Sequence, residues 1–360
     1  MPYKQSIDIF LMLSKDRGAA DFYLCVGRPP LYRRSGRLVP MHHRIITASD
    51  WQDMIKPIVR PDVWRDFCAG GDAGFAYEIS RAARFRVSLF KQERGNGAVF
   101  RVVQGSVIPV EQLGLPDSVW RFAELRSGLV IVAGPASSGK TTILAALVHL
   151  VNRHRECHII TLEDPIECVH EPIKSLVHQR ELGKHIRSFP EGLRSAARED
   201  PDVIMLGEMP DATTIRLALE SAEKGVLLLG SMHTNSVAKT IDSMVGMFPT
   251  DEQDNIQSAL SESLQGMLVQ RLLPGSEGQR VAAVELLFAT DPVRALIREG
   301  KTGDIAAILH AESKAGMRAM DASIMNLYEA GLITAQCAYD TCTDKDMFAP
   351  LLKTSGRRDR

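Results

Sequence analysis

One short segment constrains the fold of this chain more than any other, because an apolar run, a glycine-rich loop and a second apolar stretch follow one another without a gap. Residues 128–133 read Gly-Leu-Val-Ile-Val-Ala, residues 134–141 read Gly-Pro-Ala-Ser-Ser-Gly-Lys-Thr, and residues 142–148 read Thr-Ile-Leu-Ala-Ala-Leu-Val. The first run has the composition of a buried strand and the last that of a helix. The loop matches G-x-x-x-x-G-K-[ST] in full, and a strand before it and a helix after it are the context that this motif requires.

The loop predicts a site for the phosphates of a nucleotide. Glycines let backbone N–H groups turn inward around an anion, and the N-terminus of the following helix adds a positive dipole end. We expect Lys140 to bridge the β- and γ-phosphates of ATP and the hydroxyl of Thr141 to ligate Mg²⁺. A chance glycine-rich turn is the alternative, against which the flanking strand and helix argue. The residues expected to hold the nucleotide are Gly134, Pro135, Ala136, Ser137, Ser138, Gly139, Lys140, Thr141 and Thr142.

Two acidic segments follow further predicted strands, where open α/β sheets place their ligands. Glu163 and Asp164 come directly after the strand predicted at 158–162, and Glu208 comes after the strand predicted at 203–206. We expect Glu208 to polarise the attacking water, and Glu163 and Asp164 to support Mg²⁺, which takes one or two carboxylates and keeps its waters. Either acidic segment could instead only cap the next helix. His233, at the end of a fourth strand, could sense the γ-phosphate or be structural.

The rest of the chain excludes several classes of protein. The net charge is −1, and no strand interleaves basic and aromatic residues in the way that single-stranded nucleic acid requires, so we expect no nucleic-acid partner. We find no apolar run of membrane-spanning length and no secretion signal at the N-terminus. The six cysteines include no C-x-x-C, which favours reduced, mostly buried thiols in a cytosolic protein over a zinc site.

Changes in the residue pattern along the chain predict four parts. Residues 1–104 mix short strands and helices in an α+β module, and 105–117, with two glycines and two prolines, form a hinge. Residues 118–271 alternate buried strands and helices, as expected for a parallel sheet covered on both faces, and 272–360 read as a helical region ending in a frayed tail. The strands of the third part are predicted at 128–133, 158–162, 203–206 and 226–230, and its helices at 141–151, 212–222 and 236–247.

The order and spacing of these motifs resemble those of the type II/IV secretion ATPases. The phosphate loop is followed by Thr-Leu-Glu-Asp-Pro-Ile-Glu at 161–167, Arg-Glu-Asp-Pro-Asp-Val-Ile-Met-Leu-Gly-Glu at 198–208 and Gly-Ser-Met-His-Thr at 230–234. More narrowly, the chain is similar to the type IV pilus retraction ATPases, the PilT-like group. The stretches 27–30, 84–87, 263–272 and 293–300 support this resemblance, which spans roughly residues 6 to 345.

The resemblance implies an α/β fold with an N-terminal PAS-like α+β domain, a RecA-like P-loop ATPase domain and a helical C-terminal region. It also implies a homohexamer that couples ATP hydrolysis to pilus retraction and twitching motility. Such a motor is cytoplasmic and peripheral at the inner membrane, where it meets a platform protein of the pilus and possibly a paralogous retraction ATPase. Arg86 and Arg101 match the arginines of the N-terminal domain that reach phosphate in this family, although both could simply be exposed strand residues.

Three positions depart from the pattern of the family. Pro210 stands where an arginine is usual, Val226 where a histidine is usual, and Ser137 where a glycine is common. Because proline removes a charge and a backbone donor, hydrolysis could be slower, and the chain could be an accessory or regulatory paralogue with weak hydrolysis of its own. Lys140 and Thr141 remain, as do both acidic segments, so we expect an active enzyme.

Overall fold

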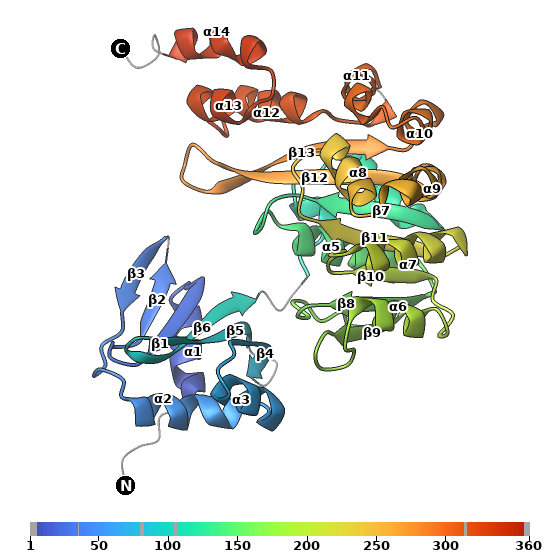
Figure 1. Ribbon diagram of the computed structural model, residues 1–360. Helices are drawn as coiled ribbons and strands as arrows, with labels where there is room; N and C mark the ends of the chain where they lie inside the picture. Colours follow the sequence, from blue (N-terminus) through green and yellow to red (C-terminus); the bar gives the residue numbers. More distant parts are fainter. Residues whose placement is uncertain (1–5, 35, 80–82, 104–106, 313–314, 356–360) are drawn as a thin grey trace. The chain divides into compact units, whose positions relative to one another are not determined.

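The computed structural model describes residues 6–34, 36–79, 83–103, 107–312 and 315–355. By its internal contacts the chain divides into two compact units (Figure 1): unit 1 gathers residues 1–106 and 165–169, and unit 2 gathers 107–164 and 170–360. The first residues of the predicted hinge (105 and 106) and most of the predicted frayed tail (356–360) lie outside the described residues. The four-part division made from the sequence stays a prediction.

Unit 1 is an antiparallel sheet with helices packed on it. Its six strands lie in the order β3-β2-β1-β6-β5-β4. Side chains alternate across the sheet, so that Phe85, Val87 and Leu89 of β5 are buried, whereas Arg86 between them is exposed. Helices α1 and α2 cover the buried face, where Phe10 stacks on Phe22. The elements are α1 Ile7–Asp16, β1 Asp21–Cys25, β2 Leu31–Arg34, β3 Arg37–Pro40, α2 Ala48–Ile55, α3 Pro61–Cys68, β4 Ala73–Ile79, β5 Ala83–Gln92 and β6 Gly95–Val103.

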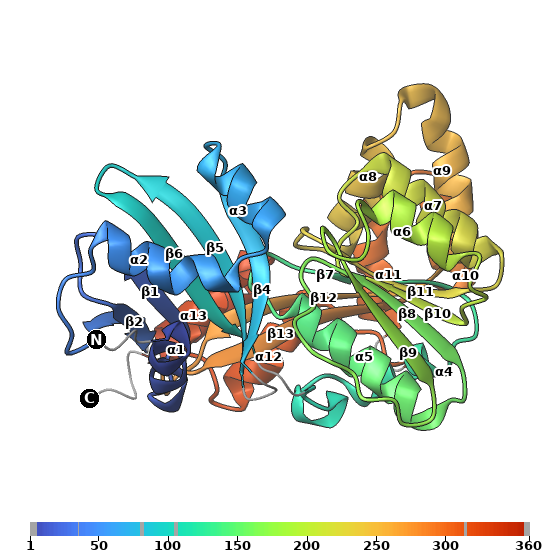
Figure 2. The ribbon, with the colours of Figure 1, turned by 90° about the horizontal axis from the view of Figure 1, so that it is seen from below.

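Unit 2 is built on a sheet of seven strands in the order β13-β12-β7-β11-β10-β8-β9. All pairs are parallel except β12 with β13. Helix α5 covers one face, and α6 and α7 cover the other (Figure 2). The elements up to the last parallel strand are α4 Arg121–Glu124, β7 Gly128–Ala133, α5 Lys140–His154, β8 His158–Glu163, β9 Leu176–Glu181, α6 Phe189–Ala196, β10 Val203–Leu206, α7 Ala212–Glu223, β11 Leu227–Met232, α8 Val237–Gly246, α9 Thr250–Ser263 and β12 Leu264–Pro274.

The chain then returns along β12 as β13 Arg280–Phe288 and continues in helices. These are α10 Asp291–Arg298, α11 Ile305–Ala311, α12 Met320–Glu329, α13 Ala335–Thr341 and α14 Lys345–Ser355. A helical region was predicted for residues 272–360. This prediction is wrong for residues 280–288, which form the strand β13. The strand pairs with β12 from Gly266↔Phe288 to Pro274↔Arg280, and such long-range pairing overrides a short apolar run that also suits a helix.

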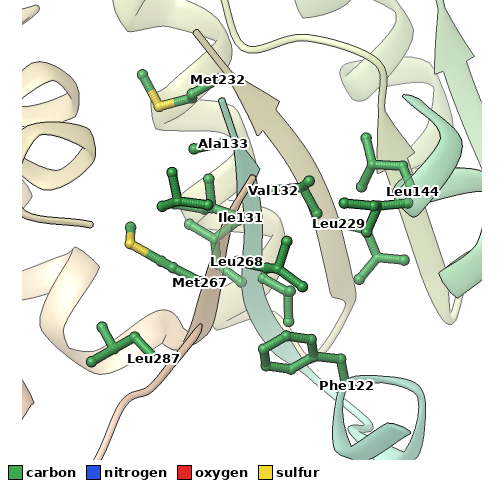
Figure 3. Packing of buried hydrophobic residues seen from close by; sticks show 14 of the residues in the cluster. Phe122, Ile131, Val132, Ala133, Leu144, Leu229, Met232, Met267, Leu268 and Leu287 are labelled. Atoms are coloured by element: carbon green, nitrogen blue, oxygen red, sulfur yellow. The ribbon is translucent and has the colours of Figure 1, made fainter. Parts of the chain in front are cut away.

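The core of unit 2 surrounds β7, whose six residues are all buried. Figure 3 shows Val132 and Leu229 lying toward Leu144 of α5, with Met267 and Leu287 on the opposite side of β7. A strand buried on both faces has no polar side, which explains its continuous apolar sequence. The central strands therefore hold the loops at their carboxyl ends on a rigid base.

The cysteines lie differently from the prediction. Among the described residues no disulfide forms, but only Cys342 is buried, Cys68 is exposed and the other four are half-buried. The expectation of mostly buried thiols is therefore wrong. Within the same residues, no helix is long and apolar enough to cross a membrane.

Candidate functional site

The glycine-rich loop runs from the end of β7 into the first turn of α5. Three residues of the loop have a positive φ: Gly134 at +156°, Ser137 at +61° and Gly139 at +93°. A side chain at Gly134 would collide with the carbonyl oxygen of Gln270 and the hydroxyl of Ser138. The amide of Gln270 on β12 donates to the carbonyl oxygen of Ser138 at 2.5 Å and ties the loop to the neighbouring strand. The loop is thus shaped by glycine where space or φ requires it, and Ser137 carries a conformation that favours glycine.

Lys140 lies buried at the start of α5 and turns back into the loop. Its ammonium group donates to the carbonyl oxygens of Gly134 and Pro135 at 3.0 and 2.9 Å. Its third close partner is Nδ1 of His233, at 3.1 Å. Burial lowers the pKa of Lys140, and the negative charge of Glu208 opposes that shift. The cation is therefore held inside the loop by neutral groups and lies within the field of one carboxylate.

His233 lies between Lys140 and Glu208. Its Nε2 is 3.2 Å from Oε1 of Glu208, and both side chains are about half exposed. An ammonium group can only donate, so Nδ1 of His233 accepts from Lys140. The three side chains form one series of close polar contacts from the loop to the acid.

The topology explains why these residues meet. The loop follows β7, the His233 segment follows β11 and Glu208 follows β10, and these strands are neighbours in the sheet. Parallel strands end at the same edge, so their following residues converge. The hydroxyl of Ser231 donates to the carbonyl oxygen of Gly207 at 2.6 Å, and the backbone N–H of Met209 donates to that of Ser231 at 3.0 Å. These bonds fix the two segments to each other.

Glu163 ends β8, the next strand beyond β10. It is buried, and its Oε1 accepts from the hydroxyl of Thr161 at 2.5 Å and from the amide of Gln179 at 3.0 Å. Gly207, directly before Glu208, donates its backbone N–H to the carbonyl oxygen of Leu162 at 2.8 Å. A backbone hydrogen bond therefore joins the segments that carry Glu163 and Glu208. The side chain that contacts Lys140 is His233, which in turn lies next to Glu208.

The remaining residues predicted for metal and nucleotide lie where the motif requires. Thr141 and Thr142 are in the first turn of α5 and half-buried, and Asp164 is exposed directly after β8. Among the described residues, no group of three or more His, Cys, Asp and Glu side chains could hold a metal ion. The hydroxyl of Thr141 and the carboxylates of Glu163 and Asp164 are oxygen ligands of the kind that Mg²⁺ takes from proteins, with its other ligands from water and phosphate.

Arg86 and Arg101 lie in unit 1, where the structure places them side by side. They are directly paired across β5 and β6, on the face of the sheet opposite the buried aromatic side chains. Nε of Arg101 donates to Oδ1 of Asp21 at 2.9 Å, and Asp21 is buried. The pairing yields two adjacent guanidinium groups on an open face of unit 1.

Sequence reasoning missed two side chains of this site, Gln179 and Gln270. Each turns its amide toward the site, to Glu163 in one case and to the loop in the other. Gln270 is buried within the largely apolar strand β12, and a buried polar side chain requires a hydrogen-bond partner, so its position was a usable signal. Gln179 is half-buried in a strand of mixed polarity, which gave no such signal.

Comparisons with known proteins agree with this arrangement. The sequence profile of the family described as Type II/IV secretion system protein matches residues 69–326. The "Type IV pilus retractation ATPase PilT" of Pseudomonas aeruginosa is 42% identical over 333 residues, covering 91% of this chain and 95% of that protein. A "Twitching motility protein" of Neisseria gonorrhoeae is 41% identical over 310 residues, covering 86% of this chain and 83% of its own length.

A solved structure shows the same fold. The crystal structure of the pilus retraction motor PilT with bound ADP superposes with a TM-score of 0.88 at 35% identity, covering 95% of this chain and 98% of that one. Such coverage extends over both units.

Proposed function

Since the chain belongs to the type II/IV secretion ATPase family, and within it to the PilT-like type IV pilus retraction ATPases, we propose that it is a motor that hydrolyses ATP to drive pilus retraction. Both relatives match over most of their length, and the PilT crystal structure holds ADP. The observation that carries the proposal is the series of close polar contacts from Lys140 through His233 to Glu208 at the mouth of the glycine-rich loop.

Lys140 is the group that binds the transferred phosphate. Its present partners in the loop are two neutral carbonyl oxygens, which phosphate oxygens can replace as charge-assisted acceptors. A phosphate beside the ammonium group favours its charged form and so opposes the lowering of its pKa by burial. Charge on the γ-phosphate is thereby stabilised as it develops.

Glu208 orients and polarises the water that attacks the γ-phosphate. Nε2 of His233 lies 3.2 Å from one carboxylate oxygen, so the ring is placed to orient the carboxylate. His233 in turn contacts Lys140, which itself binds phosphate, so loss of the γ-phosphate changes the partner of the ring. His233 would therefore couple the presence of the γ-phosphate to the conformation of the segment that follows β11.

Thr141, Glu163 and Asp164 would hold Mg²⁺ and its water shell. When bound there, the ion would supply positive charge that offsets the charge of the phosphates. Arg86 and Arg101 add two guanidinium groups from unit 1 that stabilise the transferring phosphate. These two roles rest on the family resemblance and on the pairing of the arginines across β5 and β6.

The family resemblance extends the proposal to assembly and location. We expect a homohexamer that works in the cytoplasm at the inner membrane, against a platform protein of the pilus and alongside a paralogous ATPase where one is present. The size of the ring is measured directly by mass photometry of the purified protein.

The function is tested by twitching motility and pilus retraction in a deletion strain. Wild type should restore retraction, and Lys140→Ala, which loses the phosphate-binding cation, should leave the strain piliated and non-motile. Lys239→Ala, at an exposed lysine of α8, serves as the matched control. Restoration of retraction by Lys140→Ala would exclude this chain as the ATP-driven motor.

Pro210 and Val226 favour a second candidate, an accessory paralogue with weak hydrolysis of its own. Pro210 is exposed between Glu208 and Asp211, which caps α7 by accepting from the backbone N–H of Thr214 at 2.8 Å. An arginine at 210 would therefore fit without disturbing the cap. The accessory reading predicts negligible turnover alone, recovery on mixing with a paralogue, and a gain of turnover in Pro210→Arg.

A further inference from the structure

The side chains of Thr161, Glu163 and Gln179 lie on one face of two neighbouring strands, and they meet at the carboxylate of Glu163. Thr161 and Glu163 are two residues apart on β8, so they point to the same side of the sheet. On β9, Gln179 pairs in register with Thr161, and Glu181 pairs with Glu163. Both Thr161 and Gln179 donate to the same oxygen, Oε1 of Glu163. That oxygen is therefore held from its own strand and from the next one.

The amide of Gln179 is used at both ends, which fixes its orientation. Its Oε1 accepts from the backbone N–H of His170 at 2.7 Å, while its Nε2 donates to Glu163 at 3.0 Å. A backbone N–H only donates and an ionised carboxylate only accepts, so the reverse orientation of the amide would break both bonds. The backbone at His170 thus orients Gln179, which orients Glu163.

Glu163 is buried beside a second acid. Glu163 and Glu181 are 4% and 5% exposed, and they pair in register on the same face of the sheet. A buried polar group requires hydrogen-bond partners. Thr161 supplies one donor from the same strand, and Gln179 supplies another from the neighbouring strand.

We propose that Gln179 is a positioning residue for ATP hydrolysis, acting through Glu163. This inference rests on the proposed function, in which Glu163 supports the metal and its waters. Gln179 donates to Glu163 and accepts from the backbone N–H of His170. It should therefore govern the rate of the chemical step far more than the binding of ATP.

Two substitutions separate positioning from a merely structural role. Gln179→Glu keeps the oxygen that accepts from His170 but replaces the donor facing Glu163 by a second oxygen. Gln179→Met keeps the length of the side chain and loses both bonds. We expect kcat at pH 8 to fall about tenfold in each variant, with KM for ATP changed less than about twofold.

The split between kcat and KM for ATP gives the sharpest readout. A residue that positions Glu163 for the chemical step should change kcat and leave KM nearly unchanged, and both variants should show the same split. Thermal unfolding of both variants shows that the protein remains folded.

The outcomes are distinguishable. Full turnover in Gln179→Glu at pH 8 would overturn the positioning role while leaving the motor function intact. A rise in KM with unchanged kcat would overturn it as well, since that pattern belongs to a nucleotide-binding residue. Absence of turnover in the wild-type hexamer, alone and with a paralogue, would overturn both proposals.

Discussion

Replacing His170 by leucine should remove most of the loss of stability that this protein suffers in mild acid. His170 is 5% exposed, and its Nδ1 has no hydrogen-bond partner. Burial, with a smaller contribution from the nearby charge of His149, lowers the pKa of His170 from 6.5 to about 4. The imidazole is therefore buried in its neutral form, and a proton is taken up far more readily in the unfolded chain.

The sign follows from proton linkage. Between pH 6.5 and pH 4 the unfolded chain binds the proton and the folded chain does not, so stability is full above the unfolded pKa and falls as the pH falls. A shift of about 2.5 units at about 1.4 kcal/mol per unit gives roughly 3 kcal/mol in total, of which about 2 kcal/mol is lost between pH 7.5 and pH 5. Below about pH 4 both states are protonated and the loss from this group is complete.

The assay is urea unfolding of wild type and His170→Leu at pH 7.5 and pH 5. The free energy of unfolding of wild type should fall more steeply than that of the variant, by about 2 kcal/mol. His149→Gln removes the neighbouring charge, and because that charge lowers the pKa of His170, the slope of this variant should lie between the other two. Parallel pH dependence in wild type and His170→Leu would refute the reasoning.

Three further predictions concern the loop and the arginines. Ser137 has a φ of +61°, so Ser137→Val should lose about 1–2 kcal/mol in chemical unfolding and Ser137→Gly should lose none; equal stability of the two variants would contradict this. Gly134→Ala places a methyl group on Gln270 and Ser138, and fluorescent-ADP titration should show affinity reduced about tenfold or more, equivalent to about 1.4 kcal/mol. Arg101→Gln should lower kcat and spare nucleotide affinity; unchanged turnover would make Arg101 an ordinary exposed strand residue.

Much of unit 2 could be predicted from its sequence because its central strands are buried on both faces. The strands at 128–133 and 203–206 have the predicted bounds, and the predicted helix at 212–222 ends within one residue of α7. The strand predicted at 226–230 runs instead from Leu227 to Met232, two residues further into the His233 segment. Strand ends depend on pairing, here with β7 and β10, which a local pattern does not contain.

What the sequence could not provide was long-range pairing. The hairpin of β2 and β3 is short and rich in arginine, and β9 mixes polar and apolar residues, so neither has the continuous apolar run of a buried strand. The same holds for the site. The motifs placed Lys140, Glu163 and Glu208 at strand ends, but the contact of His233 with both Lys140 and Glu208 required knowing that β7, β11 and β10 are neighbours.

The central claim is that the glycine-rich loop, Lys140, His233 and Glu208 form one site for ATP hydrolysis. It is tested most directly by measuring turnover of MgATP and affinity for nucleotide in parallel, in wild type and in Glu208→Gln. The account predicts that wild type hydrolyses ATP and that the variant binds nucleotide with similar affinity and turns over at least about a hundredfold more slowly. Wild-type turnover in Glu208→Gln, or no binding of nucleotide by wild type, would contradict it.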